Sequence, residues 1–342
     1  MGLQITWFVL WGVLWAVYFM LDGFVLGSGM LQNFLARNDT ERRVVINTLG
    51  PVWDGNEVWL ITAGGATFAA FPTTYALMFS YLYTALLLLL FSLIVRGVSF
   101  EFRSKVESDT WRGLWDKAIL VFSFLPALLF GVAFGNIFKG LEMDALGYHG
   151  NLLTLLNPYG LVTGVLFVLL FLVHGALYLS LKTRGELSAR SVRTATAFWP
   201  ALLVVAVAFL VSTWFATKLF DNFLATPLLL VVPVVAVGAL LMIRVSLAGG
   251  KTGQAFVASC VTILSVVATG VVGLFPNLIP SSIDPAYSLT IFNSSSSPYT
   301  LRIMTVVAFI FVPIVILYKI WVYRIFRAPV TDEDVLGDKQ AY

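Results

Sequence analysis

Long apolar runs follow one another through almost the whole chain, with only short polar gaps between them. A run of about 20 apolar residues is enough to cross the hydrocarbon core of a bilayer as a helix. Only 11% of the 342 residues are charged, whereas a soluble protein has roughly 25%. Most of the outer surface must therefore face lipid, and the sequence predicts an all-α integral membrane protein.

Apolar windows of about 19 residues predict nine transmembrane helices in a single polytopic membrane domain, residues 1–342. The expected helices cover about residues 6–31, 48–70, 77–97, 117–137, 159–181, 196–216, 226–246, 254–276 and 302–325. Prolines agree with these limits, since Pro72 follows the second helix and Pro227 opens the seventh. The first helix has no basic residue before it and continues past Asp22, so we expect a retained helix rather than a cleaved signal peptide.

The basic residues predict the orientation. With the N-terminus outside, 18 of the 21 Lys and Arg residues fall in inner segments, and only Lys139, Lys218 and Arg302 fall in outer ones. The inner set counts Arg96, at the inner end of the third expected helix, and Lys339 in the C-terminal tail. Such an excess is what the positive-inside rule describes. We therefore expect the N-terminus outside and the C-terminus inside the cell.

The sequence excludes several kinds of metal, nucleotide-binding and catalytic site. The single cysteine, Cys260, excludes an internal disulfide and a metal cluster built from thiolates of this chain alone. We find no nucleotide-binding loop, catalytic triad or zinc-ligand spacing, and we expect no nucleic-acid partner. The longest loops are expected at residues 98–116 on the inside and at 139–158 and 277–301 on the outside. The last of these is expected to fold against helix ends or a partner.

Three acids, Asp22, Asp54 and Glu57, fall inside the expected helices, whereas the other 15 of the 18 acids lie in loops, tails or helix ends. An ionised acid at mid-helix costs about 2.5–3.5 kcal/mol on insertion scales. Such a group faces the bundle interior, pairs with another group or stays protonated. Asp54 and Glu57 are three residues apart on one helix face, where two carboxyl groups would share a proton and titrate together.

Distances along the helices place these acids at or below the bilayer midplane. Asp54 lies about 16 Å beyond Arg43, and Asp22 about 22 Å before Arg37, at about 1.5 Å per residue. Neighbouring antiparallel helices would bring the three acids together. The prediction is a proton-conducting path from the cytoplasm through Asp54, Glu57 and Asp22.

A purely structural role for these acids is the alternative, because buried acids also hold helices together by hydrogen bonds. Gly23, Gly27 and Gly29 beside Asp22 indicate close helix packing. His174, in the inner half of the fifth helix, fits hydrogen-bonded packing better than a proton relay, and a relay better than an axial haem ligand. Since His149 lies in an outer loop, a haem held between two histidines of this chain is disfavoured, and with it an independent electron carrier.

Several segments resemble one family throughout the chain. The segment GPVWDGNEVWLITAGGATFAAFPTTYA resembles the signature of subunit II of the cytochrome bd-type quinol oxidases. DGFVLGSGML, RNDTERR, RGVSFEFRSK, TWRGLWDKAI, GVAFGN, LLNPYGLVTG, FPNLIPSS and MTVVAFIFVPIVILY also match, in the same order.

The resemblance implies a non-haem subunit of a respiratory oxidase complex in the bacterial cytoplasmic (inner) membrane. Two four-helix bundles plus one peripheral helix are the expected fold. The partner, subunit I, would carry two haems b and one haem d, oxidise quinol and reduce oxygen to water. Subunit II would line a proton route through Asp54. Some members also hold a structural quinone or a small single-helix accessory subunit, which leaves both open here.

The chain departs from the family at two of these positions. Many members have a second acid where this chain has Val25, and many have glutamine where it has Glu57, so Glu57 would supply the missing carboxyl. A proton-coupled secondary transporter is the alternative function, although the matched, interrupted half-helices typical of such folds are not evident.

Overall fold

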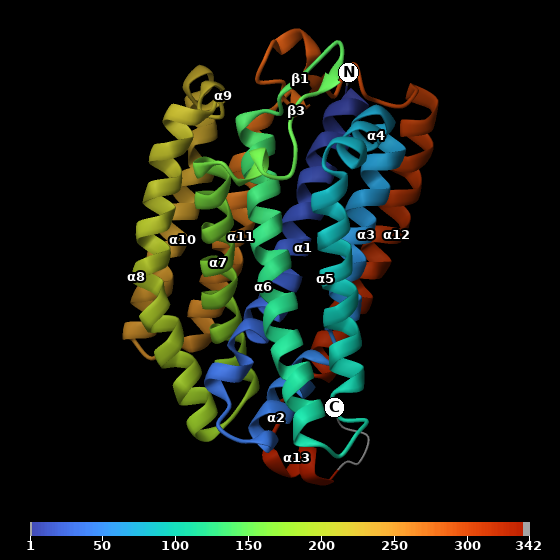
Figure 1. Ribbon diagram of the computed structural model, residues 1–342. Helices are drawn as coiled ribbons and strands as arrows, with labels where there is room; N and C mark the ends of the chain where they lie inside the picture. Colours follow the sequence, from blue (N-terminus) through green and yellow to red (C-terminus); the bar gives the residue numbers. More distant parts are fainter. Residues whose placement is uncertain (1, 338–342) are drawn as a thin grey trace.

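The computed structural model describes residues 2–337 and is helical almost throughout, as predicted (Figure 1). The helices are α1 (Gly2–Leu35), α2 (Asp39–Leu49), α3 (Trp53–Ala70), α4 (Pro72–Tyr81), α5 (Tyr83–Phe102), α6 (Asp109–Lys139), α7 (Pro158–Lys182), α8 (Gly185–Ala216), α9 (Asp221–Ala225), α10 (Val231–Ala248), α11 (Thr252–Leu274), α12 (Pro298–Ile325) and α13 (Asp332–Gly337). Four short strands and three 3₁₀ turns lie in the connections. They are β1 (Met143–Asp144), β2 (Gly147–Tyr148), β3 (Asn277–Ile279), β4 (Leu289–Thr290), η1 (Thr154–Leu156), η2 (Pro227–Leu230) and η3 (Pro285–Tyr287).

Eight helices among residues 2–337 are long and apolar enough to cross a membrane, namely α1, α5, α6, α7, α8, η2 with α10, α11 and α12. The expected second span differs from the others. It breaks after α2 at residues 50–52, and α3 then begins with a polar turn that holds Asp54, Asn56 and Glu57. These polar residues lower the mean hydropathy of α3. For this reason α3 is not among the eight helices that are apolar enough to cross a membrane.

Helix α1 lies at the centre and packs against α3, α6, α7 and α11. Its aromatic side chains form the core, as where Phe19 meets Phe130 of α6 and Phe167 of α7 edge to face at 5.3 and 5.1 Å between ring centroids. α12 lies at the side of the molecule (Figure 1), and the most apolar part of it contains no buried residue.

Glycines allow α1 and α7 to touch along their backbones. A Cβ placed on Gly175 would lie 2.5 Å from the carbonyl carbon of Gly27 and from the amide nitrogen of Ser28. A Cβ placed on Gly29 would lie closer still to the side-chain oxygen of Ser123 on α6. Close packing was the expected role of these glycines, and the structure agrees.

The two long loops predicted on the outside meet at one end of the molecule, which we call the hairpin end (Figure 1). β1 pairs antiparallel with β2, and β3 with β4. A bridge between Leu141 and Ser281 joins the two hairpins, with hydrogen bonds of 2.9 Å from Leu141 N–H to Pro280 and from Ser282 N–H to Leu141. The 277–301 segment also docks on a helix end, since Ser296 N–H donates to the carbonyl of Ala70 at 2.9 Å.

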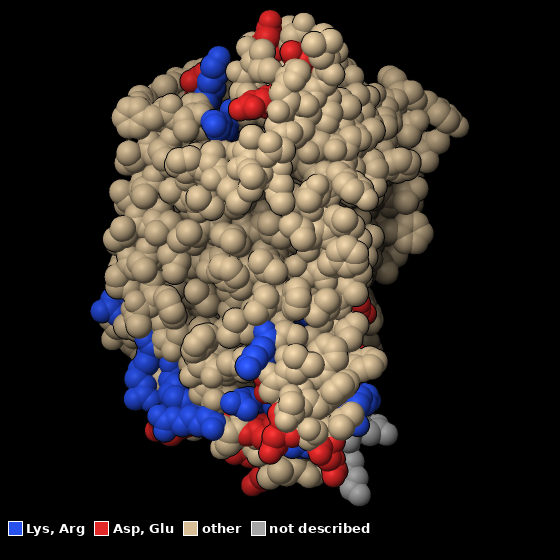
Figure 2. Space-filling model, in the orientation of Figure 1, with Lys and Arg blue, Asp and Glu red and all other residues tan. Residues whose placement is uncertain are grey.

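Most visible Lys and Arg side chains gather at the opposite end, which holds α2 and α13 and which we call the basic end (Figure 2). A broad belt without visible charge separates the two ends. One sequence assignment changes here. Arg96 lies inside α5, because that helix continues to Phe102, and its side chain is wholly buried. Lys339 lies outside the described residues.

Candidate functional site

Arg96 joins two of the three predicted acids inside the helical bundle. Its Nη2 atom donates to Asp22 Oδ2 at 3.1 Å and also forms an ion pair with Glu57. The side chains of Arg96 and Asp22 are fully buried, and that of Glu57 is 20% exposed. The Tyr18 hydroxyl donates to Asp22 Oδ2 at 3.1 Å. We call Asp22, Glu57 and Arg96 the acid cluster.

The acid cluster has two acidic groups and only one basic group. Two carboxyl groups face one guanidinium, so the cluster carries one net negative charge when both acids are ionised and none when one proton is bound. Net charge is unfavourable in a low-dielectric interior. The geometry therefore suits a site that binds and releases one proton.

Asp54 lies apart from the acid cluster, contrary to the expected meeting of all three acids. It is exposed on the surface of α3, whereas Glu57 on the same helix points to Arg96. Asp54 and Glu57 still interact electrostatically. Lys319 of α12 is close enough to Asp54 for their charges to interact. The structure thus places one acid at the surface and two behind it.

Asn56 connects α3 to α1 and to α12 by hydrogen bonds. Its side-chain amide donates to the carbonyl of Leu21, next to Asp22, at 2.8 Å. Its side-chain oxygen accepts a hydrogen bond of 2.9 Å from the hydroxyl of Tyr323 on α12. Tyr323 thus reaches the neighbourhood of the acid cluster from the peripheral helix.

His174 is enclosed by its own chain. Its Nδ1 lies 2.6 Å from the hydroxyl of Ser259, and its Nε2 lies 2.9 Å from the carbonyl oxygen of Met20. The ring also stacks on Phe256, with centroids 4.9 Å apart. Both ring nitrogens are occupied, which fits hydrogen-bonded packing and does not fit an axial ligand of haem.

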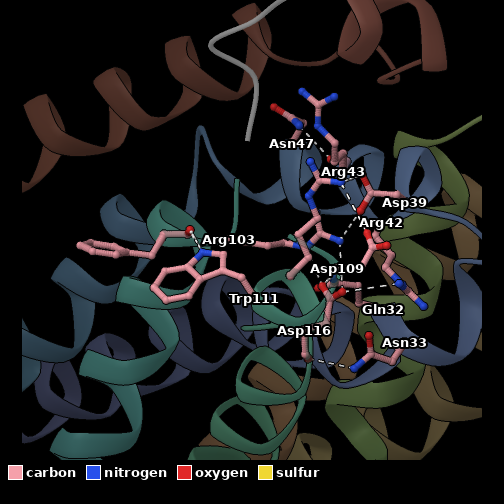
Figure 3. A network of polar contacts seen from close by, with 12 residues as sticks. Gln32, Asn33, Asp39, Arg42, Arg43, Asn47, Arg103, Asp109, Trp111 and Asp116 are labelled. Carbon is pink, nitrogen blue, oxygen red and sulfur yellow. Dashed lines mark hydrogen bonds and ion pairs between the residues drawn. The ribbon is translucent and has the colours of Figure 1, made fainter. Parts of the chain in front are cut away.

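A second polar network lies nearer the basic end (Figure 3). Arg103, directly after α5, donates from Nε to Asp116 Oδ1 at 2.6 Å and from Nη2 to Asp39 Oδ1 at 2.7 Å. Gln32 of α1 donates to the same Asp116 oxygen at 2.8 Å. We call Gln32, Asp39, Arg42, Arg103 and Asp116 the ionic network. It ties together α1, α2, α6 and the end of α5.

The electrostatics of the ionic network favour the charged form of Asp39. Partial burial alone would raise the pKa of Asp39, but the hydrogen bond and charge of Arg103 outweigh it, so that the pKa lies below its usual range. The sequence analysis placed Arg103 and Asp116 in an inner loop. Both are buried, because α5 and α6 extend further than the apolar windows indicated.

Comparisons with known proteins agree with this architecture. The family model for "Cytochrome bd terminal oxidase subunit II" matches residues 3–326. The chain belongs to this family. It is 40% identical to cytochrome bd-I ubiquinol oxidase subunit 2 of Escherichia coli K12, over 97% of this chain and 96% of the relative. It is 36% identical to cytochrome bd ubiquinol oxidase subunit 2 of Bacillus subtilis, over 97% and 98% of the two chains.

A solved structure supports the fold. A chain of the bd oxidase from Geobacillus thermodenitrificans superposes with a TM-score of 0.79, covering 95% of this chain and 99% of the other at 17% sequence identity. As a member of the family, the chain is a multi-pass protein of the bacterial inner membrane and part of a quinol oxidase complex of respiratory electron transport. The family implies haem in that complex and a partner subunit I.

Proposed function

We propose that this subunit lines the path by which cytoplasmic protons reach the oxygen-reducing site of its partner. The observation that carries the proposal is the pairing of an exposed acid, Asp54, with two acids held behind it by Arg96. An exposed carboxylate on a membrane helix is costly against lipid but suited to a protein boundary. We therefore infer that α3 faces subunit I.

The proposed arrangement has nine membrane spans, with α3 as the one beyond the eight apolar helices. Two four-helix bundles, α1, α3, α5 and α6 and then α7, α8, α10 and α11, would form one polytopic domain with α12 at its periphery. The division follows the family resemblance, and α1 also packs on α7 and α11, and α6 on α7, so the two bundles are in close contact. The basic end would lie in the cytoplasm, with the N-terminus outside.

In this proposal the acid cluster stores one proton at a time. Arg96 keeps Asp22 and Glu57 within reach of each other, and the missing positive charge makes protonation of one of them favourable. Glu57, partly exposed and three residues from Asp54, passes the proton between the cluster and the α3 surface. Asp54 delivers it to subunit I.

We assign two haems b and one haem d to subunit I, where they would supply the electron chemistry of quinol oxidation and oxygen reduction to water. Among residues 2–337 no cluster of His, Cys, Asp or Glu fits a metal ion, and the ring nitrogens of His174 are already occupied. A structural quinone and a single-helix accessory subunit stay expectations from the family. Family membership also leaves no observation that favours a proton-coupled transporter.

The test is an Asp54→Asn variant of the assembled complex. Removing the ionisable group at nearly constant volume should lower quinol oxidase turnover by about tenfold or more, with the haem absorption spectrum unchanged. Asp109→Asn, an exposed acid outside the proposed path, is the matched control and should keep full turnover. Full turnover in Asp54→Asn would reject the proton role, and loss of haem would indicate a structural one.

A further inference from the structure

A pocket of about 360 Å³ opens at the basic end of the molecule. Its wall is formed by the residues between α2 and α3, the last turns of α7 and α12, and α13. At about 30 Å³ per water molecule, it has room for roughly ten waters. Polar side chains, including Thr48, Tyr178, Lys182 and Tyr323, stand among apolar ones in its lining.

The C-terminal segment is fastened so that it completes this pocket. Lys182 donates through Nζ to the backbone carbonyls of Phe326 and Ala328. The N–H of Val330 donates back to the carbonyl of Lys182 at 2.9 Å. Val335 of α13 is buried against the bundle. The pocket is therefore a built feature of the fold, with a wall from the chain's own tail.

Tyr323 links the pocket to the acid cluster. The residue lines the pocket, and its hydroxyl donates to Asn56, whose amide holds the carbonyl of Leu21 beside Asp22. Asp22 is near enough to interact electrostatically with Tyr323. These two hydrogen bonds lead from the pocket to the backbone carbonyl of Leu21, the residue that precedes Asp22.

The acid cluster also offers polar atoms for water. The Nε and Nη1 atoms of Arg96 are buried and have no acceptor in the part of the chain that the structure describes. A buried donor without an acceptor is unfavourable, so an acceptor such as water is stabilised at both atoms. Water can therefore be held at the cluster as well as in the pocket.

We propose that this pocket is the water-filled entrance through which cytoplasmic protons reach the acid cluster, with Tyr323 as the positioning residue at its inner end. The protons pass along hydrogen-bonded water, and Tyr323 and Asn56 keep their own protonation. This inference rests on the proposed function and adds to it the place where protons enter.

The experiment blocks the pocket after assembly, so that folding is not at issue. Ala328 is replaced by cysteine in the complex, and inverted membrane vesicles are treated with a bulky, membrane-impermeant methanethiosulfonate reagent. Turnover is measured on the same sample before and after labelling. Ala189→Cys, an exposed position on α8 at the same end, is the matched control. The complex with the unsubstituted chain is labelled in the same way, so that any loss of turnover caused by reaction at Cys260 is measured.

Labelling of Ala328→Cys should lower turnover by about fivefold without changing the haem spectrum, whereas labelled Ala189→Cys should keep its turnover. Full turnover of labelled Ala328→Cys would overturn the entrance. If the turnover of Asp54→Asn were still lowered in that case, the proposed function would stand without this entrance. If labelled Ala328→Cys lost turnover while Asp54→Asn kept it, the entrance would serve another proton route. The proton role of Asp54 would then be rejected.

A second variant tests Tyr323 itself. Tyr323→Phe removes the hydroxyl but keeps the ring beside Phe24. We expect about threefold lower turnover and a weaker inhibitory effect of labelling at Ala328→Cys, because the route is already interrupted. Tyr318→Phe, exposed on the same helix, is the control. Unchanged turnover in Tyr323→Phe would remove Tyr323 from the entrance.

Discussion

At the scale of single residues, Arg96 carries its charge on a side chain with no exposed surface, between Asp22 and Glu57. Removing one partner of a buried ion pair costs about 3–5 kcal/mol. An Arg96→Met variant should therefore lower the melting temperature of the purified complex or prevent its assembly. Thermal unfolding followed by the haem spectrum measures this.

A double variant distinguishes charge from packing in that result. In Arg96→Met with Asp22→Asn, one carboxyl is removed together with the guanidinium, so most of the lost stability should return. If the double variant is no more stable than Arg96→Met, the contribution of Arg96 comes from packing of its side chain and not from its charge.

The sequence predicted which acids lie in the membrane but not how they are arranged. Three residues turn a helix through about 300°, so Asp54 and Glu57 point about 60° apart. That angle is enough to place Glu57 at Arg96 and Asp54 at the surface. Arg96 was missed because the count of basic residues placed it with the inner segments, at the end of the third expected helix, and gave it no partner inside the bundle. The signal was its position directly after the apolar run that ends at Val95.

At the scale of helices, the contact between α1 and α7 depends on Gly27 and Gly175. A Gly175→Leu variant should force the two backbones apart, and overpacking costs about 1–3 kcal/mol or more. We expect less assembled complex in the membrane, measured by the haem content of purified membranes.

Gly238→Leu provides the comparison within a membrane helix. Apart from Gly238, its two chain neighbours and the backbone of its own helix, no atom of the described residues lies within 4 Å of a Cβ at Gly238 on α10. The same added volume should leave the haem content unchanged there. Equal losses in both variants would show that leucine at any membrane glycine is harmful, and would contradict the proposed role of the α1–α7 contact.

Helix ends were the least predictable part of the fold. Apolar windows end where charges begin, yet α5 continues through Arg96 to Phe102, and α6 begins at Asp109 with Ser108 as its cap. These polar turns are stable because their charges pair with each other in the ionic network. Pairing between distant segments, such as Arg103 with Asp39, cannot be read from hydropathy.

At the scale of the whole molecule, the ionic network makes stability depend on pH. Because the pKa of Asp39 in the folded chain lies below its usual range, the charged form favours folding. This contribution is fully present above the usual pKa of about 3.9 and is lost as the pH falls through the lower, folded-state value.

Comparison with Asp39→Asn tests this dependence. The melting temperature of the variant complex should lie below that of the unsubstituted complex at pH 7 and at pH 5, and the difference should shrink below about pH 4. Asp284→Asn, at the hairpin end, should show no such trend. A difference that stays constant down to the most acidic pH would exclude the charge of Asp39 as its source.

The two ends of the molecule are held by different forces. Main-chain hydrogen bonds join the hairpins through Leu141, whereas ion pairs of Arg103 and a hydrogen bond from Gln32 tie α1, α2 and α6 at the other end. Dissolved ions weaken attraction between partly exposed charges and have little effect on amide hydrogen bonds. Changes in cytoplasmic ionic strength should therefore loosen only one face of the subunit, the face where protons are proposed to enter.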